Sequence, residues 1–405
     1  MRQWRALPAS RSVVSLQQYQ ELLAKPEIRA AFLASVLGRL PIGMSGLAIL
    51  LLAQSASGSF AYAGAAVASY IAGLAIMAPL LGRIIDRSGP ARTLLVCGFL
   101  YPSALLALCA AVLRAFPMLA VLGLAFAAGA SYPPITVCMR TFFRQRLGEE
   151  RLLATAYSLE SVLIESIFVL GPMLVAFFVA LASPAAAVVS AALCALAGAF
   201  LFARSPALAH WRIEKLRRGM VLGPLAEPGF PALLAVVLFY SVAFGLIEIG
   251  VTAYASEIGH PALAGVLLAI MSIGSACGGL AYGSRHWRTR LSLQFALALL
   301  LIGAGVGALA LVANPWLFAF MSTLAGVVMA PALTIQSMLV ARISSPGSAT
   351  EAFTWSSAAL LTGVGGGMAF GGTLLERAPA AAALAWAGVA AVLGAATALA
   401  WLRRD

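Results

Sequence analysis

The chain has 405 residues, of which 62% are hydrophobic and only 10% carry a charge. A soluble globular domain carries a charge on about a quarter of its residues, so this composition excludes an ordinary soluble protein. Basic residues outnumber acidic ones by 26 to 14, but they lie in short segments between apolar runs, a pattern typical of membrane topology. We therefore expect a lipid bilayer as the partner of this protein, and no nucleic acid.

Twelve apolar runs follow one another along the chain, each long enough for a helix of roughly 20 residues that crosses a bilayer. The runs cover residues 29–53, 61–81, 93–113, 117–139, 153–180, 184–203, 230–255, 261–283, 291–313, 315–340, 351–374 and 380–401. Residues 1–28 are mostly polar and show no cleavable signal, so we expect a cytoplasmic N-terminal segment. The predicted fold class is an all-α membrane protein with twelve transmembrane helices.

The segments between the runs show a strong charge bias. If the N-terminus lies inside, the cytoplasmic segments hold 23 of the 26 Lys and Arg residues, whereas the outer loops hold only Arg114 and Arg377. Loops rich in Lys and Arg stay on the cytoplasmic side of a membrane. We therefore expect both termini in the cytoplasm and, for a bacterial protein, a multi-pass location in the inner membrane.

The connection between the second and third runs concentrates charges and glycines in a few residues. Gly82 and Gly89 permit close backbone approach or a positive φ, and Asp86 and Arg87 offer a charge pair or contacts to helix ends. Together with Arg92 these residues match the pattern G-x-x-x-D-R-x-G-x-x-R. The segment resembles the signature loop between the second and third helices of the major facilitator superfamily.

The two halves of the chain repeat each other. Gly129 and Pro134 in the fourth run correspond to Gly326 and Pro331 in the tenth, at an offset of 197. A fixed offset of this kind indicates a duplication.

The family resemblance implies that the two repeats form two pseudo-symmetric six-helix bundles. We place the bundles at residues 29–203 and 230–402. A cytoplasmic linker at residues 204–229 joins them, and we interpret it as a short amphipathic surface helix followed by irregular chain.

Charged residues inside the spans are the strongest candidates for function, because each costs about 2.5–3.5 kcal/mol on insertion scales and is usually functional or paired. Arg39 lies near mid-depth in the first span, and Glu160 and Glu165 lie in the fifth. The two glutamates are about 140° apart around the helix axis, so they cannot both face a central cavity. We expect Arg39 and Glu165 to interact, either as a proton-coupling pair or as a permanent ion pair that locks two helices.

Other candidates are weaker. Glu248 in the seventh span is expected as a second carboxylate that faces the same cavity from the other half, with Tyr132 and Trp355 among its aromatic lining. Glu160 is expected to brace the cytoplasmic loops together with Arg140 or Arg144. Glu351 is expected to act as an anion at the N-terminus of the eleventh helix.

The resemblance implies a secondary transporter that works by alternating access, as a monomer, with its site near mid-membrane between the halves. The mostly apolar cavity residues favour a small amphiphilic substrate, such as a drug, a siderophore or a metabolite, exported in exchange for protons. The alternative is uptake or uniport of a small organic anion with Arg39 as its carboxylate anchor.

Departures from the drug-exporting branches leave both possibilities open. Ala125 stands where those exporters place an arginine, and Ile167 where they place a glycine. The expected spans contain no paired Asp, no Ser–His pair and no metal-ligand cluster, so we expect no enzyme and no metal site. The proton gradient is the expected energy source, and no cofactor is expected.

Overall fold

The computed structural model describes residues 17–209, 211–213, 223–260, 263–285 and 287–401, and within these residues it is helical with no strand. The helices of the first half are α1 Gln17–Leu23, α2 Pro26–Ser57, α3 Phe60–Ser88, α4 Pro90–Leu113, α5 Met118–Ala130, α6 Ile135–Arg146, α7 Glu150–Leu181, α8 Pro184–Ala203 and α9 Pro206–Ala209. Those of the second half are η1 Gly223–Ala226, α10 Phe230–Glu257, α11 Leu263–Gly283, α12 Leu291–Leu309, α13 Pro315–Gly326, α14 Met329–Ile343, η2 Pro346–Ser348, α15 Ala349–Leu375 and α16 Ala380–Trp401.

The predicted number of spans is confirmed, because 12 stretches of the described chain are long and apolar enough to cross a membrane. Their outer faces carry large apolar side chains, among them Leu119, which is 82% exposed, and Leu181, which is 69% exposed. Exposed apolar surface on this scale suits hydrocarbon and not water.

The fourth and tenth spans are each broken into two helices. The fourth consists of α5 and α6, which are separated by residues 131–134, and the tenth consists of α13 and α14, which are separated by residues 327–328. Pro133 and Pro134 have no backbone N–H to donate within a helix, which explains the first break. Both breaks lie beside the Gly and Pro positions that repeat in the sequence, as a duplicated fold requires.

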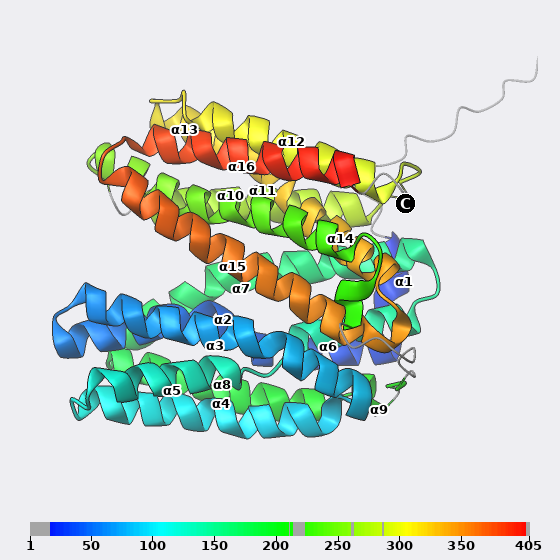
Figure 1. Cartoon of the computed structure of the whole chain (residues 1–405), viewed down its shortest axis with the longest axis horizontal. Coiled ribbons are helices and arrows are strands. Elements are labelled where there is room, and N and C mark those ends of the chain that lie inside the picture. The colour runs from blue at the N-terminus through cyan, green and yellow to red at the C-terminus, as the bar shows by residue number, and fades with distance from the viewer. Residues whose placement is uncertain (1–16, 210, 214–222, 261–262, 286, 402–405) are drawn as a thin grey trace, which may run out of the picture.

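The helices form two bundles, as Figure 1 shows. Helices α2 to α5 and α8 lie on one side, α10 to α13 and α16 lie on the other, and α7 and α15 run obliquely between them (Figure 1). Helices α1, α6 and α9 and the last turn of α16 lie at the same end of the molecule. This end also holds Asp86, Arg144 and Arg342, and we call it the basic end.

Small residues bring helices into close contact inside the first bundle. A Cβ on Gly198 of α8 would lie 2.1 Å from the Cα of Gly38 in α2, so only glycine fits at this crossing. A chain of hydroxyl groups, Ser45 to Tyr101 at 2.6 Å and Tyr101 to Tyr70 at 3.3 Å, joins α2, α4 and α3. These contacts fix α2, and with it Arg39, which follows Gly38 directly.

The linker between the bundles contains α9 and the short 3-10 helix η1. The predicted amphipathic surface helix falls largely on residues 214–222, which lie outside the described residues.

Candidate transport site between the two bundles

The signature loop joins the two bundles at the basic end. Oδ2 of Asp86 accepts a hydrogen bond of 2.8 Å from the backbone N–H of Glu351, and Oδ1 accepts one of 3.0 Å from that of Thr350. Both donors lie in the first turn of α15, where backbone N–H groups have no partner within the helix and the helix dipole favours an anion. Of the two roles expected for Asp86, the helix-end contact is realised, and its partner belongs to the other bundle.

Glu351 has a second role besides the one its sequence position indicates. It lies in the first turn of α15, as expected for an anion at the N-terminus of its own helix. In addition, the Glu351 carboxylate accepts two hydrogen bonds from the Arg83 guanidinium, at 2.6 and 3.1 Å. Asp86 and Arg83 therefore both contact the first turn of α15. Asp86 binds its backbone N–H groups, and Arg83 forms an ion pair with its Glu351 side chain.

The two glycines of the loop serve different purposes. A Cβ on Gly82 would lie 2.5 Å from Oγ1 of Thr354 and 2.8 Å from Cα of Glu351, so glycine lets α3 touch α15. Gly89 has a φ of +82° and its N–H closes the end of α3, so it provides the turn. Arg87 and Arg92, the remaining residues of the pattern, are both exposed.

Further contacts join the bundles beside this loop. The Arg144 guanidinium donates to the hydroxyl of Ser344 at 2.9 Å and to its carbonyl at 2.6 Å, which connects α6 to the end of α14. On α7, Thr155 donates to the carbonyl of Gly283 at 2.7 Å, and Ser158 donates to the carbonyl of Gly279. Each of these α7 hydroxyl groups satisfies a carbonyl of α11.

The innermost contact of this series involves Glu165, which lies near the middle of α7. Its Oε1 accepts a hydrogen bond of 3.0 Å from the hydroxyl of Ser275 in α11. The same hydroxyl oxygen accepts the backbone N–H of Ala330 at 3.0 Å, so the Ser275 proton is directed at the carboxylate. Glu165 therefore lies at the junction of the bundles and contacts the second one directly.

The expected interaction of Arg39 with Glu165 is wrong, because Arg39 pairs with Glu160. Nη1 of Arg39 lies 3.0 Å from Oε1 of Glu160, and both side chains are fully buried. Nε of Arg140 lies 3.9 Å from the same oxygen, which realises the expected neighbourhood of Glu160 and Arg140. The groups are in ion-pair contact without the alignment of a directed hydrogen bond. The 140° between the glutamates decides the outcome, since Glu160 faces α2 and Glu165 faces α11.

Comparison with known proteins agrees with this architecture. A family model described as Major Facilitator Superfamily matches residues 31–306, more than half of the chain. This chain belongs to the major facilitator superfamily. The protein is thus a multi-pass membrane protein of a class of secondary transporters and not of enzymes.

Several solved structures share the fold of this major facilitator protein. A bacterial homologue of the iron transporter ferroportin, in an outward-facing state, has a TM-score of 0.77 and 15% identity over 93% of this chain and 99% of its own. The human organic anion transporter MFSD10 has a TM-score of 0.69 and 19% identity over 92% and 98%. The E. coli fucose:proton symporter FucP has a TM-score of 0.69 and 15% identity over 92% and 98%. No curated protein matched the chain.

The remaining site candidates of this transporter are not joined to the Arg39 group by any hydrogen bond or ion pair in the described part of the chain. Glu248 is exposed on α10, and its backbone carbonyl accepts the hydroxyl of Thr252 at 2.7 Å. Tyr132 is only 8% exposed and packs edge-on against Tyr101, with ring centroids 5.3 Å apart. Trp355 is partly buried on α15. Their roles as cavity lining remain predictions.

Sequence reasoning missed the residues that complete the contacts between bundles. Nothing in the sequence around Ser275 and Ser344 indicates a partner in the other half. Only Arg83 had a signal, because it lies inside the charged signature loop. The contacts of the two serines can be recognised only from the arrangement of the helices.

Proposed function

We propose that this transporter exports a small amphiphilic molecule in exchange for protons, with Glu165 as the residue that carries the proton. The observation behind the proposal is the hydrogen bond of 3.0 Å from Ser275 to Glu165 across the two bundles. A rocking motion that parts the bundles at the basic end removes this donor and opens the carboxyl group to that side. The protonation of Glu165 and the conformation of the transporter are therefore linked.

The orientation of the molecule assigns the two openings of the proposed export cycle to the two sides of the membrane. The excess of Lys and Arg at the basic end favours a cytoplasmic location for that end. Both termini would then lie on the cytoplasmic side of a bacterial inner membrane. The described hydrogen bonds between the bundles lie at the basic end or reach inward as far as Glu165, so this conformation would open to the outside. Glu165 would take its proton from the outside and release it to the cytoplasm, while the substrate moves in the opposite direction.

The distribution of charge supports an amphiphilic substrate. Arg39 and Arg140 offset the charge of Glu160, which leaves Glu165 and Glu248 as the uncompensated acidic groups of the central spans. A sugar would need many polar partners at its site, whereas an apolar, lightly charged solute needs few. The transporter would work as a monomer, with the proton gradient as its energy source.

Transport in everted membrane vesicles tests the proposal. A pH-sensitive dye reports the proton gradient while lipophilic cations, organic acids and siderophores are added in turn. We expect one compound class to collapse the gradient with the wild-type chain and with Glu376→Gln, a matched variant of an exposed glutamate. Glu165→Gln should abolish this response. A compound-dependent response that persists in Glu165→Gln contradicts the proposed proton carrier.

A second candidate function rests on the charge around Glu160. Two arginines, Arg39 and Arg140, share this one carboxylate, so the group has an excess of positive charge. An organic anion that displaces Glu160 from Arg39 would make the transporter an importer or uniporter of such anions. Uptake of labelled benzoate into intact cells tests this function, and Arg39→Gln should abolish that uptake while Glu165→Gln should not.

A further inference from the structure

A pocket of about 400 Å³ lies at the basic end, at a distance from the signature loop. Its wall is built from both bundles, with Glu150 and Arg151 from α7 on one side and Met338 and Arg342 from α14 on the other. The connection between α11 and α12 completes it. This connection is the second-half counterpart of the signature loop, and nothing in the transport cycle above uses it.

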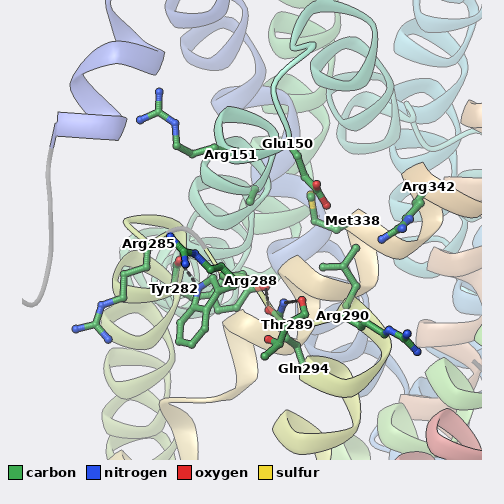
Figure 2. A pocket seen from close by; sticks show the side chains of 13 residues that line it. Glu150, Arg151, Tyr282, Arg285, Arg288, Thr289, Arg290, Gln294, Met338 and Arg342 are labelled. Carbon is green, nitrogen blue, oxygen red and sulfur yellow. Dashed lines mark hydrogen bonds between the residues drawn. The ribbon is translucent and has the colours of Figure 1, made fainter. Parts of the chain in front are cut away.

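Positive charge dominates the lining of this pocket. Its charged residues are one glutamate, Glu150, and five arginines, Arg151, Arg285, Arg288, Arg290 and Arg342. Figure 2 shows Arg151 and Arg285 on one side of the view and Arg290 and Arg342 on the other, with Glu150 between them. Membrane topology explains why arginines occur at this end, but not why arginines of three separate segments line one hollow.

The guanidinium groups of the pocket differ in whether a carboxylate already pairs with them. Arg151 is engaged with Glu21 at 2.9 Å and Glu149 at 3.6 Å. In contrast, Arg288 and Arg342 are exposed and lie within 4 Å of no carboxylate in the described part of the chain. Planar guanidinium groups match the oxygens of a phosphate with two parallel hydrogen bonds, so a phosphate group is the chemistry that this lining fits best.

Ring stacking and hydrogen bonds connect several residues that line the pocket. Trp287 stacks on Tyr282 with ring centroids 5.2 Å apart and donates its indole N–H to the Tyr282 carbonyl at 3.1 Å. Gln294 accepts the Tyr282 hydroxyl at 2.6 Å and donates to the carbonyl of Thr289 at 2.6 Å. These contacts hold the connection in place before a ligand arrives, so little ordering is needed on binding.

The position of the pocket favours a lipid as the source of the phosphate. It lies where α11, α12 and α14 end, at the depth at which lipid headgroups meet a membrane protein. Three leucines of α12 form a stripe at helical spacing that starts beside the pocket: Leu293 is 52%, Leu297 55% and Leu301 49% exposed. Acyl chains running along this stripe would place the headgroup of the same lipid at the arginines, with Trp287 at the interface.

We propose that the pocket formed by α7, α14 and the α11–α12 connection is a binding site for the phosphate headgroup of an anionic lipid. The lipid contacts both bundles in the conformation described, and the site is separate from the route of the transported molecule. Its recognition of charge depends on Arg288 and Arg342, which reach the pocket from different segments.

Lipid binding to the purified full-length protein tests this proposal. Bound lipid is counted by native mass spectrometry during titration with dioleoylphosphatidylglycerol, and dioleoylphosphatidylcholine serves as the uncharged reference lipid. Arg288→Gln/Arg342→Gln should weaken phosphatidylglycerol binding about tenfold, since hydrogen bonds from two charged groups are lost. Arg29→Gln/Arg212→Gln, which removes two exposed arginines at the same end outside the pocket, should bind like the wild type. Arg288→Lys/Arg342→Lys, which keeps the charge but not the planar fork, gives intermediate binding and replaces the Gln variant if that one does not fold.

A third arm separates lipid from soluble phosphate. Inorganic phosphate at millimolar concentration should displace phosphatidylglycerol only partly, because it lacks the acyl chains that follow α12. Stabilisation by inorganic phosphate without any preference for phosphatidylglycerol would overturn the lipid as ligand. Equal loss of binding in the two double Gln variants, or equal binding of both lipids by the wild type, would overturn the site itself.

Discussion

The carboxylate of Asp86 in the first bundle accepts a hydrogen bond of 2.8 Å from the backbone N–H of Glu351 in the second. These residues are 265 positions apart in the sequence, and the contact places a negative charge on the first turn of α15. Because the two bundles must separate here for the basic end to open, the strength of this contact helps to set the balance between the conformations.

Asp86→Asn should reduce transport at least tenfold without removing the protein from the membrane. The amide keeps the shape of the side chain but loses its charge and one of its two acceptor oxygens. A hydrogen bond to a charged group is worth about 1.5–3 kcal/mol, which corresponds to a tenfold or larger shift in the balance between conformations. Vesicle transport normalised to membrane protein measures the effect, with Glu376→Gln as the acid-to-amide control. Normal turnover of Asp86→Asn would mean that the loop is only a turn.

Gly82→Ala should also impair transport, for a steric reason. The new methyl group would lie 2.5 Å from Oγ1 of Thr354 and 2.8 Å from the Cα of Glu351, and the backbone of α15 can only move away. The two bundles would then fail to close against each other at the basic end. Gly64→Ala on the same helix is the matched control, because a Cβ there meets nothing within 4 Å. Equal activity of the two variants would show that close contact of α3 and α15 is not needed.

Glu160→Gln should lower the stability of the folded protein. It leaves Arg39, which is fully buried, without a counter-charge, and loss of one partner of a buried pair typically costs about 3–5 kcal/mol. We expect a clear drop in the melting temperature of the detergent-solubilised protein.

The matched comparison for this prediction uses methionine at both positions. Arg39→Met/Glu160→Met should melt above Glu160→Met alone, since the double variant buries no unpaired Arg39. If the double variant is the less stable one, the ion pair itself, and not the cost of an isolated charge, supports the first bundle.

The sequence by itself determined the membrane location, the number of spans, the duplication and the signature loop. These features depend on composition, on the length of apolar runs and on local spacing, all of which are properties of neighbouring residues along the chain. The breaks at residues 131–134 and 327–328 do not belong to this group, because the runs 117–139 and 315–340 were expected to be continuous helices.

The partners of the charged residues were decided only by the tertiary structure. Helical periodicity separates Glu160 from Glu165 by direction, but it does not say which neighbouring helix each direction meets. Because α2 packs against α7 and α8, Arg39 lies beside Glu160. Because α7 packs against α11, Glu165 accepts a hydrogen bond from Ser275. Likewise, Arg288 and Arg342 share a pocket only because the end of α14 lies beside the α11–α12 connection. Side chains far apart in sequence meet through helix packing, which is a property of the assembled bundles and not of any single segment.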